Sequence, residues 1–434
     1  MEMMSDSASL VLLVGTNPLP NYVIADFLSS KGAVSTIYFV YSESNDKRNQ
    51  NGTKEYADNI KECLKKNLRQ KVNVKFTPLC DVSSFREIER DFDKYFQELK
   101  KQKMHLNITG GTKTMAASSY AWFKEKCSSL EVSYLDARTH KLIYENNNDN
   151  LNGGDLRECV RLNIECLLAL HGYKMTEDSL QTQNDCAKYS CVLEFIPELI
   201  KDDNFICFVK DINKIFRQNK FWSNYKDLLK ENFKKCTVAE YLTKYLENEK
   251  IKEFLSRFPK DQSLIEDGSW WAPPQNTSEN QIKKRVKDSI KYLKGMWLEQ
   301  YVYEDLKKVL TEKSLRENEN FGWSLKAKKD NGAKNFELDI FFLIGYQLTG
   351  ISVTSSEDEN LVKSKAFEVL HRVSQIGGEE SMAILLCGLD NCKIQTFEDD
   401  IQQTTGSTKE KFKVFGINDW QDIGKKIKDF ILDN

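Results

Sequence analysis

The first 150 residues alternate between apolar segments of strand length and amphipathic segments of helix length, and this alternation restricts the fold more than any other feature. Residues 10–14 form an unbroken apolar run that ends at Gly15, as expected of a parallel strand buried on both faces. A helical segment follows and stops at Gly32. Because later segments repeat this order, the pattern predicts an α/β fold with a mostly parallel sheet and right-handed crossovers.

Polar or glycine-rich residues follow four of the predicted strands. They occupy positions 15–18, 42–44 and 80–83 and the loop that begins at Thr109. Ligands of parallel sheets bind beyond the carboxyl ends of the strands. We therefore expect these four loops to meet at one edge of the sheet and to form a binding site there.

The loop at residues 109–115, TGGTKTM, is the most distinctive of the four. Its two glycines allow a sharp turn and a close approach of the backbone to a ligand. The free N–H groups of the following helix start favour anions, and the threonine hydroxyls and Lys113 add donors for phosphate or ribose oxygens. A tight strand-to-helix turn capped by threonine explains the same residues. The spacing excludes a P-loop, and no GxGxxG follows the first strand.

Length and composition limit the remaining possibilities. A chain of 434 residues should hold two or three domains, and 29% charged with 40% apolar residues is typical of a soluble globular protein. The net charge is −2, so the chain as a whole is not basic, and any surface that binds nucleic acid must be a local basic patch. No apolar run approaches the roughly 18 residues needed to span a bilayer, so no membrane partner is expected. The acidic N-terminus argues against a signal peptide, and the 11 cysteines without a CxxC pair predict free thiols in the cytoplasm.

Two polar breaks divide the chain. Residues 146–155 are rich in asparagine and glycine and predict the first boundary. The segment at 267–278 contains two consecutive prolines, which forbid a helix, and predicts the second. We therefore expect domains at 1–150, 151–275 and 276–434. The middle one should be a helical connecting region that acts as a spacer and helps the protein to dimerise.

Acidic residues stand out in the last third. Glu299 lies in a predicted helix at about 281–311, and Asp339 lies in the strand FELDIFFLIG, where Glu337 shares its face. A carboxylate in an apolar strand needs a partner or a metal. Acids that converge from a helix and a strand suit Mg²⁺ or Mn²⁺, which could activate water against a phosphodiester.

The helix predicted after the next strand carries charges at helical spacing. Lys365, Glu368 and Arg372 form one stripe, and Lys363 lies on the other side of the helix. The adjacent apolar face should dock on the sheet; its residues are Val362, Ala366, Val369 and Val373. A lysine here could stabilise a developing phosphorane charge. An ordinary amphipathic helix with a solvated flank is the alternative.

Both ends of the chain together resemble one known family. The segment TGGTKTM resembles the signature of CARF domains, the cyclic-oligoadenylate sensors of type III CRISPR antiviral systems, and the last third is similar to the PD-(D/E)xK nuclease module. The whole architecture resembles the dimeric CARF–nuclease effectors. This resemblance implies a Rossmann-like CARF domain, a helical connecting region and a restriction-endonuclease-like α/β domain.

The resemblance also implies a ligand. Two CARF domains of a homodimer would share one pocket for a ring of four or six adenylates, with cyclic tetra-adenylate the commoner in this architecture. The residues that match the family's ligand loops are Thr16, Asn17, Thr109, Gly110, Gly111, Thr112, Lys113 and Met115.

The nuclease motif departs from the family pattern. An acid-x-Lys pair is usual on the strand after the aspartate, but this chain has Ser352 and Thr354 there. Charged groups of this fold can migrate to the next helix, so Lys365 and Glu368 are expected to replace the missing pair. The implied site has Glu299, Asp339, Glu368 and the Val353 carbonyl on the metal, Lys365 as charge stabiliser, and Ser352 and Thr354 positioning water or metal.

Two functions follow as expectations. The first is a metal-dependent endonuclease, acting on DNA, RNA or both, that cyclic oligoadenylate activates allosterically. The second is a cyclic-oligoadenylate-binding dimer whose degenerate nuclease fold serves as an interaction module, which Ser352 and Thr354 favour.

Overall fold

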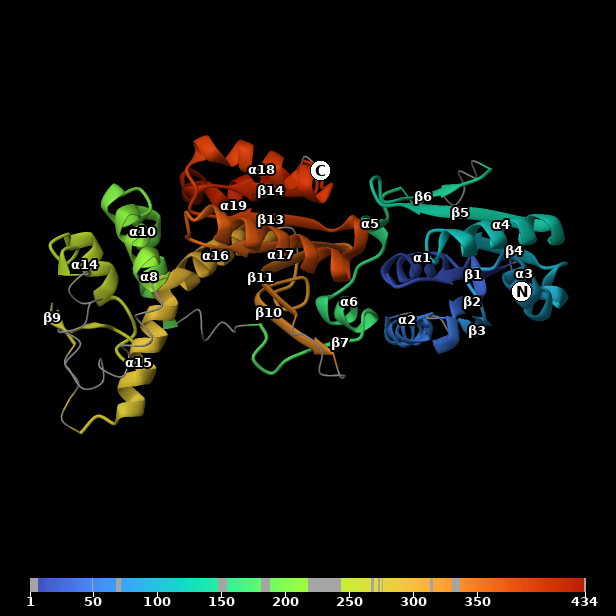
Figure 1. Cartoon of the computed structure of the whole chain (residues 1–434), viewed down its shortest axis with the longest axis horizontal. Helices are drawn as coiled ribbons and strands as arrows, with labels where there is room; N and C mark the ends of the chain where they lie inside the picture. Colours follow the sequence, from blue (N-terminus) through green and yellow to red (C-terminus); the bar gives the residue numbers. More distant parts are fainter. Residues whose placement is uncertain are drawn as a thin grey trace.

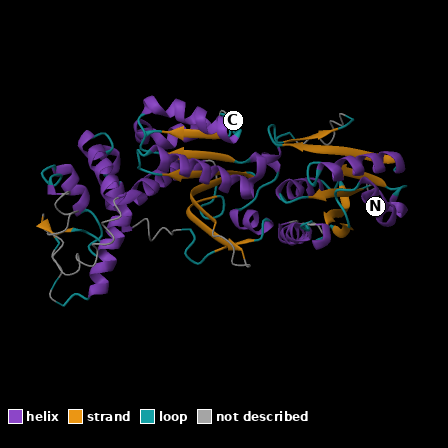
Figure 2. Ribbon diagram, viewed as in Figure 1, coloured by secondary structure: helices purple, strands orange, loops and turns teal. Residues whose placement is uncertain are grey.

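The computed structural model describes most of the chain. The described residues are 7–48, 50–67, 72–146, 154–180, 188–217, 243–266, 269–271, 274, 276–312, 315–329 and 336–432. Figure 1 shows an N-terminal domain and a C-terminal domain, each built on a sheet, with a helical arm on the far side of the C-terminal domain. Helices flank both sheets (Figure 2). None of the described helices has the length and apolar character needed to cross a membrane.

The N-terminal domain contains a six-stranded sheet in the order β3-β2-β1-β4-β5-β6. All neighbouring strands are parallel except β6, which runs antiparallel to β5. This arrangement confirms the predicted, mostly parallel α/β domain. Its elements are β1 (Ala8–Val14), α1 (Leu19–Ser30), β2 (Val34–Ser42), α2 (Lys54–Asn67), β3 (Asn73–Leu79), α3 (Phe85–Phe96), β4 (Lys103–Asn107), α4 (Lys113–Lys126), β5 (Ser129–Asp136) and β6 (Lys141–Tyr144).

The central strand β1 is buried on both faces, as its apolar run predicts. Leu10 and Leu12 belong to the hydrophobic cluster that also contains residues of α1 and α2. Val11 and Leu13 belong to the cluster with residues of α3 and α4. Since alternate side chains of one strand enter opposite clusters, the domain has helices on both sides of its sheet.

The C-terminal domain also contains a six-stranded sheet, in the order β14-β13-β12-β11-β10-β7. Strands β12, β13 and β14 are parallel, whereas β7, β10, β11 and β12 pair antiparallel. Apolar residues of α17 pack in one cluster with one face of the sheet, and those of α16 and α19 in another. The elements are α16 (Trp297–Glu312), β10 (Phe321–Lys329), β11 (Phe336–Ile344), β12 (Gln347–Val353), α17 (Glu359–Gly377), β13 (Met382–Leu386), α18 (Asn391–Thr405), β14 (Phe412–Phe415) and α19 (Ile423–Leu432).

The segment between the domains is mainly helical where it is described, with two differences from the predicted spacer. Strand β7 pairs with β10, so the chain enters the C-terminal sheet before the arm begins. Strands β8 and β9 form a small hairpin-like sheet at the predicted second linker. Most of the predicted first boundary, residues 147–153, lies outside the described residues. The elements are α5 (Leu156–Cys159), α6 (Ile164–Leu170), β7 (Tyr173–Met175), α8 (Ser190–Leu193), α9 (Ile196–Leu199), α10 (Asp203–Arg217), α14 (Glu249–Ser256), β8 (Ile265–Glu266), β9 (Ser269–Trp270) and α15 (Glu279–Lys291).

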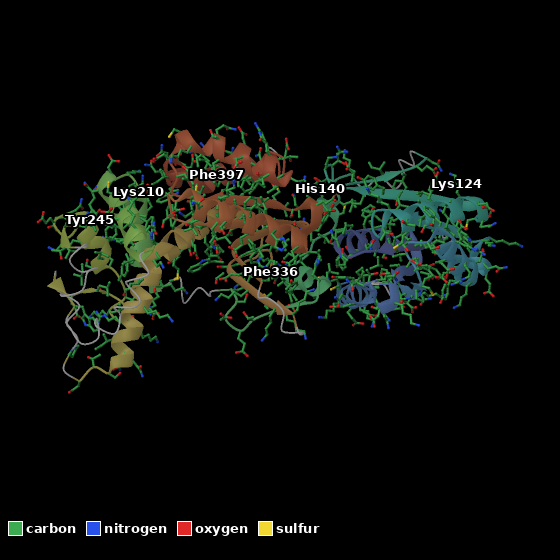
Figure 3. The ribbon with its side chains drawn as sticks, in the orientation of Figure 1. Lys124, His140, Lys210, Tyr245, Phe336 and Phe397 are labelled. Atoms are coloured by element: carbon green, nitrogen blue, oxygen red, sulfur yellow. The ribbon has the colours of Figure 1, made fainter. Side chains whose placement is uncertain are left out.

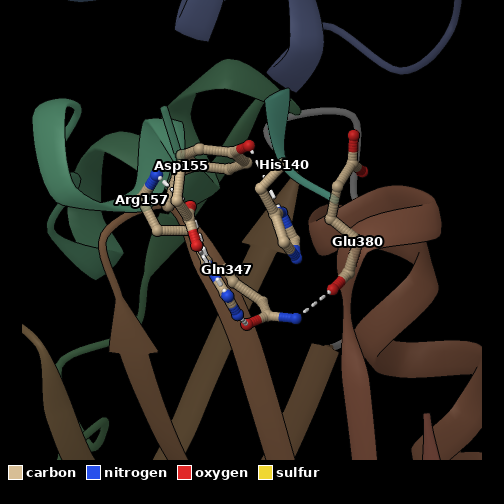
Figure 4. Close-up of polar contacts among 6 residues, drawn as sticks. His140, Asp155, Arg157, Gln347 and Glu380 are labelled. Carbon is tan, nitrogen blue, oxygen red and sulfur yellow. Dashed lines mark hydrogen bonds and ion pairs between the residues drawn. The ribbon is translucent and has the colours of Figure 1, made fainter. Parts of the chain in front are cut away.

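A buried polar cluster joins the two sheet domains (Figure 4). His140 is labelled in Figure 3, on the part of the N-terminal domain that faces the C-terminal one. The distance from its Nδ1 atom to the hydroxyl oxygen of Tyr346 is 3.3 Å. Arg157 donates to Gln347 at 2.7 Å, and Gln347 donates to the backbone carbonyl of Glu380 at 2.9 Å. The contact of His140 with Tyr346 joins the two sheet domains, and the bond from Arg157 to Gln347 ties the connecting segment to the C-terminal one.

Glu380 makes this boundary sensitive to pH. Its side chain is buried, its Oε2 atom lacks a hydrogen-bond partner among the described residues, and burial raises its pKa from 4.5 to about 7. Stability is therefore lost as the pH rises from 4.5 through 7, because the folded state must then carry an unpaired buried charge. Glu380→Gln should raise the free energy of unfolding by about 2–3 kcal/mol at pH 8 and leave it unchanged near pH 4.5.

Urea denaturation at the two pH values measures this difference. The matched control is Glu379→Gln, since Glu379 is the exposed neighbour of Glu380. Equal stability of wild type and Glu380→Gln at pH 8 would contradict the assignment.

Candidate functional site

The strand-end loops of the N-terminal domain lie at the same edge of its parallel sheet, as predicted. The loops after β1 and β4 touch, since a Cβ added at Gly15 would be 3.1 Å from the backbone nitrogen of Gly111. A Cβ at Gly110 would overlap the carbonyl oxygen of Leu13, and Gly111 has a φ of +75°. The two glycines are thus required by the contact between the loops and by the turn itself.

The threonines of this loop have structural partners. Thr112 is the N-cap of α4, with its hydroxyl accepting from the Met115 backbone N–H at 3.1 Å, and the buried Met115 sulfur lies 3.5 Å from the Thr112 nitrogen. The hydroxyl of Thr109 accepts from the Leu135 N–H at 2.7 Å. The threonine-capped turn that was the alternative interpretation of this loop is therefore present. It leaves Lys113 exposed in the first turn of α4, without a hydrogen bond or ion pair to any described residue.

The loop after β1 reaches the C-terminal domain. Thr16 is exposed, whereas Asn17 is half-buried and accepts from the Leu19 N–H at 3.2 Å. A Cβ added at Gly378, just after the end of α17, would overlap the side-chain amide nitrogen of Asn17. The predicted ligand residue Asn17 is therefore in direct contact with the end of a C-terminal helix.

In the C-terminal domain, α16 and β11 bring Glu299 and Asp339 together. The indole N–H of Trp323 donates to Glu299 at 3.3 Å. Asp339 accepts from the Ser352 hydroxyl at 3.0 Å and from the Val353 N–H at 2.9 Å. Burial, and then the nearby charge of Asp339, raise the pKa of Glu299 to about 7. The two acids thus form a close pair of like charges, here called the acid pair.

The helix α17 places its charged stripe beside the acid pair. Lys365 and Glu368 form an ion pair at 3.3 Å. Burial opposes the charged form of Lys365, but the charges of Asp339 and Glu368 outweigh it and raise its pKa. Lys363 pairs with Asp400 of α18 at 2.7 Å. The predicted docking face is also confirmed, because Val362, Ala366, Val369 and Val373 are buried.

Two cavities flank the acid pair and share Glu299, Glu337 and Asp339 as a wall. The first, called the α17 cavity, has about 250 Å³ and is also lined by Ser352, Lys365, Glu368 and Arg372. The second, called the α15 cavity, has about 210 Å³ and is also lined by Lys291, Lys294, Ser324, Lys326, Val353 and Thr354. All residues predicted for catalysis and metal binding therefore line one of these cavities.

The donor set fits a divalent cation only in part. No group of three or more His, Cys, Asp or Glu in the described ranges is arranged to hold a metal ion. Glu299 and Asp339 do lie together, and their mutual repulsion would fall on binding a cation. Because Mg²⁺ is usually held by one or two carboxylates with water and substrate phosphates, the pair is sufficient for such a site. Glu368 as a third ligand stays a prediction, since it pairs with Lys365.

Sequence reasoning missed Ser324, which faces Asp339 across the β10–β11 ladder. The ladder pairs Trp323 with Ile340 and Leu325 with Leu338, with no pair at Ser324 and Asp339. Ser324 has a φ of +58°, and its carbonyl accepts from the Leu180 N–H at 2.9 Å. This distortion interrupts the sheet at the acid pair. A single serine within a strand gives no sequence signal for it.

Comparison with known proteins bears on both domains. Residues 9–163 match the family model of the Card1 CARF domain. No curated protein sequence matches the chain. The fold is similar to protein VC1899 from Vibrio cholerae, with 13% identity, a TM-score of 0.64 and coverage of 98% of each chain. It is also similar to Can2 from Sulfobacillus thermosulfidooxidans, solved in complex with cyclic tetra-adenylate, with 14% identity, a TM-score of 0.58 and coverage of 99% and 98%.

These likenesses establish the architecture. The chain combines a Rossmann-like N-terminal domain of the CARF type with a second α/β sheet domain. At such low identity the two solved structures support the fold of the whole chain and do not identify its chemistry.

Proposed function

We propose that this protein is a CRISPR accessory effector that binds cyclic oligoadenylate through its N-terminal domain and hydrolyses nucleic-acid phosphodiesters at the acid pair. The match of residues 9–163 to the Card1 CARF domain supports the first half. The acid pair, with Lys365 and Arg372 in the adjoining cavity, supports the second.

Cyclic tetra-adenylate is the proposed activator. The N–H groups at the start of α4 and the exposed ammonium of Lys113 suit the phosphates of such a ring. The similarity to Can2, which was solved with this ligand, supports the choice. Exposed Tyr134 and Ile143, which face each other across β5 and β6, offer an apolar surface for a homodimer that would share the ring.

The proposed chemistry is attack of a water oxygen on phosphorus, with the ester oxygen leaving and taking a proton. When bound at Glu299 and Asp339, Mg²⁺ or Mn²⁺ would supply a more acidic water and neutralise charge on the leaving oxygen. The hydrogen bonds from Trp323 and Ser352 orient the two carboxylates. Lys365 is placed to stabilise the negative charge that develops on phosphorus oxygens.

The helix α17 is the observation that carries the proposed activation. It holds Lys365 in the α17 cavity, and the residue that follows its last turn, Gly378, contacts Asn17 of the ligand loops. Gly378 follows Lys365 by thirteen positions, so the helix covers roughly 20 Å between them. In this proposal the loop after β1 has two positions, and the ring binds one of them more tightly. Binding would then favour that position and move α17, which the loop contacts through Asn17.

Exchange of Lys365 for alanine tests the catalytic half. Lys365→Ala should slow cleavage about 10- to 100-fold, the rate equivalent of the 1.5–3 kcal/mol that a charged hydrogen bond contributes, and leave ring affinity unchanged. Cleavage of single-stranded RNA and plasmid DNA with Mn²⁺ and saturating ring is the measurement. Lys363→Ala is the matched control, because Lys363 pairs with Asp400 away from both cavities. Full activity of Lys365→Ala would refute its assigned role.

A non-catalytic interaction module is the second candidate, and Ser352 and Thr354 in place of an acid and a lysine favour it. One assay separates the two. Plasmid and single-stranded RNA are incubated with the protein, Mn²⁺ and cyclic tetra- or hexa-adenylate. Nicking supports the nuclease, and the absence of nicking in every combination supports the module.

A further inference from the structure

The α15 cavity is lined by cations that the proposed chemistry does not use. Lys291, Lys294 and Lys326 line it, on the opposite side of the acid pair from Lys365 and Arg372. Lys326 has a partner in Asp178 at 2.8 Å. The acid pair is therefore flanked by positive charge in both cavities, an arrangement that suits consecutive phosphates of one strand on either side of the cleaved bond.

We propose that Lys291 and Lys294 form a phosphate-binding subsite that holds the nucleic-acid strand beyond the scissile phosphate. This inference rests on the proposed nuclease function. It assigns substrate binding to the end of α15 and the turn after it, which the sequence analysis placed in the nuclease domain without a role. Contacts to phosphates alone carry no sequence information, so binding at this subsite would be independent of base sequence.

The backbone around these lysines is shaped and anchored. A π-helical turn at Tyr292–Met296 interrupts the path from α15 to α16, with Gly295 at a φ of 157°. Such turns are rare and are frequently found at functional sites. The residues before, within and after the turn that line the α15 cavity are Lys291, Lys294, Gly295, Met296 and Glu299.

Contacts from two other elements hold this turn beside the acid pair. The hydroxyl of Ser355, just beyond β12, donates to the Lys294 carbonyl at 3.3 Å. The side-chain amide of Asn213 in α10 donates to the same Ser355 at 3.0 Å. Since β12 also carries Ser352, whose hydroxyl binds Asp339, the arm is connected to the acid pair through one short segment. The lysines are thus placed by packed structure and not by a loose extension.

The experiment measures binding rather than cleavage. Asp339→Asn protein with saturating cyclic tetra-adenylate and Mg²⁺ is titrated into a fluorescent 20-nucleotide single strand, DNA or RNA, at several salt concentrations. The added double change Lys291→Glu with Lys294→Glu should weaken binding at least tenfold. The slope of log affinity against log salt should fall by about 1.4, since each lost single-strand phosphate contact contributes about 0.7.

The control is Lys284→Glu with Lys287→Glu, two exposed residues of the same helix that do not line the cavity. It should bind within twofold of the parent. The milder pair Lys291→Gln with Lys294→Gln, checked by thermal unfolding, separates lost contacts from misfolding. Equal affinities for the lysine variants and the control would overturn the inference alone. Absence of nucleic-acid binding in every protein, with ring binding intact, would overturn both it and the proposed nuclease function.

Discussion

Replacement of Asp339 by asparagine is expected to reduce nucleic-acid cleavage by about 10³-fold while the affinity for cyclic tetra-adenylate stays within twofold. Asparagine can still accept the hydrogen bonds that Ser352 and Val353 donate to Asp339. The fold should therefore survive. The change removes one of the two charges that would hold the proposed cation, and losses of single electrostatic contributors in active sites reach this size. Cleavage of labelled RNA and plasmid DNA with Mn²⁺, together with calorimetry of ring binding, measures both quantities.

The control for this variant is Asp399→Asn, which neutralises a half-buried acid of α18 that lines neither cavity. It should cleave at the wild-type rate. Activity above a tenth of wild type in Asp339→Asn would show that the cation, and hence the chemistry, lies elsewhere. The parallel retention of ring binding is essential, because loss of both activities would indicate a damaged fold.

Replacement of Lys113 by alanine is expected to weaken ring binding by about 10²- to 10⁴-fold. A charged hydrogen bond contributes about 1.5–3 kcal/mol, and a homodimer that shares one ring loses two, about 3–6 kcal/mol in total. Calorimetry with cyclic tetra-adenylate measures the loss. Cleavage should then need a higher concentration of ring but reach the same maximum rate. Lys113 lies in the N-terminal domain and lines neither cavity beside the acid pair.

Lys126→Ala is the matched control for Lys113→Ala, because Lys126 is at the opposite end of α4 and pairs with Glu125. Its ring affinity should equal that of wild type. An unchanged affinity in Lys113→Ala would remove the main cation from the proposed ligand site, and a reduced maximum rate at saturating ring would assign it a different role.

The sequence predicted the N-terminal domain well because the information there is local. The apolar run in β1 and the glycine after α1 each lie within a few residues of the feature that they specify. The double glycine was harder. The two glycines indicated a sharp turn. Gly110 is required, however, because a larger residue would overlap the carbonyl oxygen of Leu13, which lies 97 positions earlier in the chain and is not part of any local pattern.

The C-terminal domain shows the same division. The docking face of α17 and its charged stripe follow from helical periodicity, and the structure confirms the face. The helix predicted at about 281–311 is interrupted by the π-helical turn, which the sequence did not indicate beyond a single glycine. Strand β7 was missed because it pairs with β10, about 150 residues later, and a three-residue strand has no periodicity to detect.

The amino-acid sequence by itself determined which segments become strands and helices, which faces are apolar, and which acids, lysines and hydroxyls are available for chemistry. Only the tertiary structure decided that Glu299 approaches Asp339, that the arm brings Lys291 beside them, and that Asn17 contacts the end of α17. Secondary structure depends on interactions between residues a few positions apart, which the sequence pattern records directly. Contacts between distant segments depend on how all apolar faces of the chain are buried together. No short stretch of sequence records that arrangement.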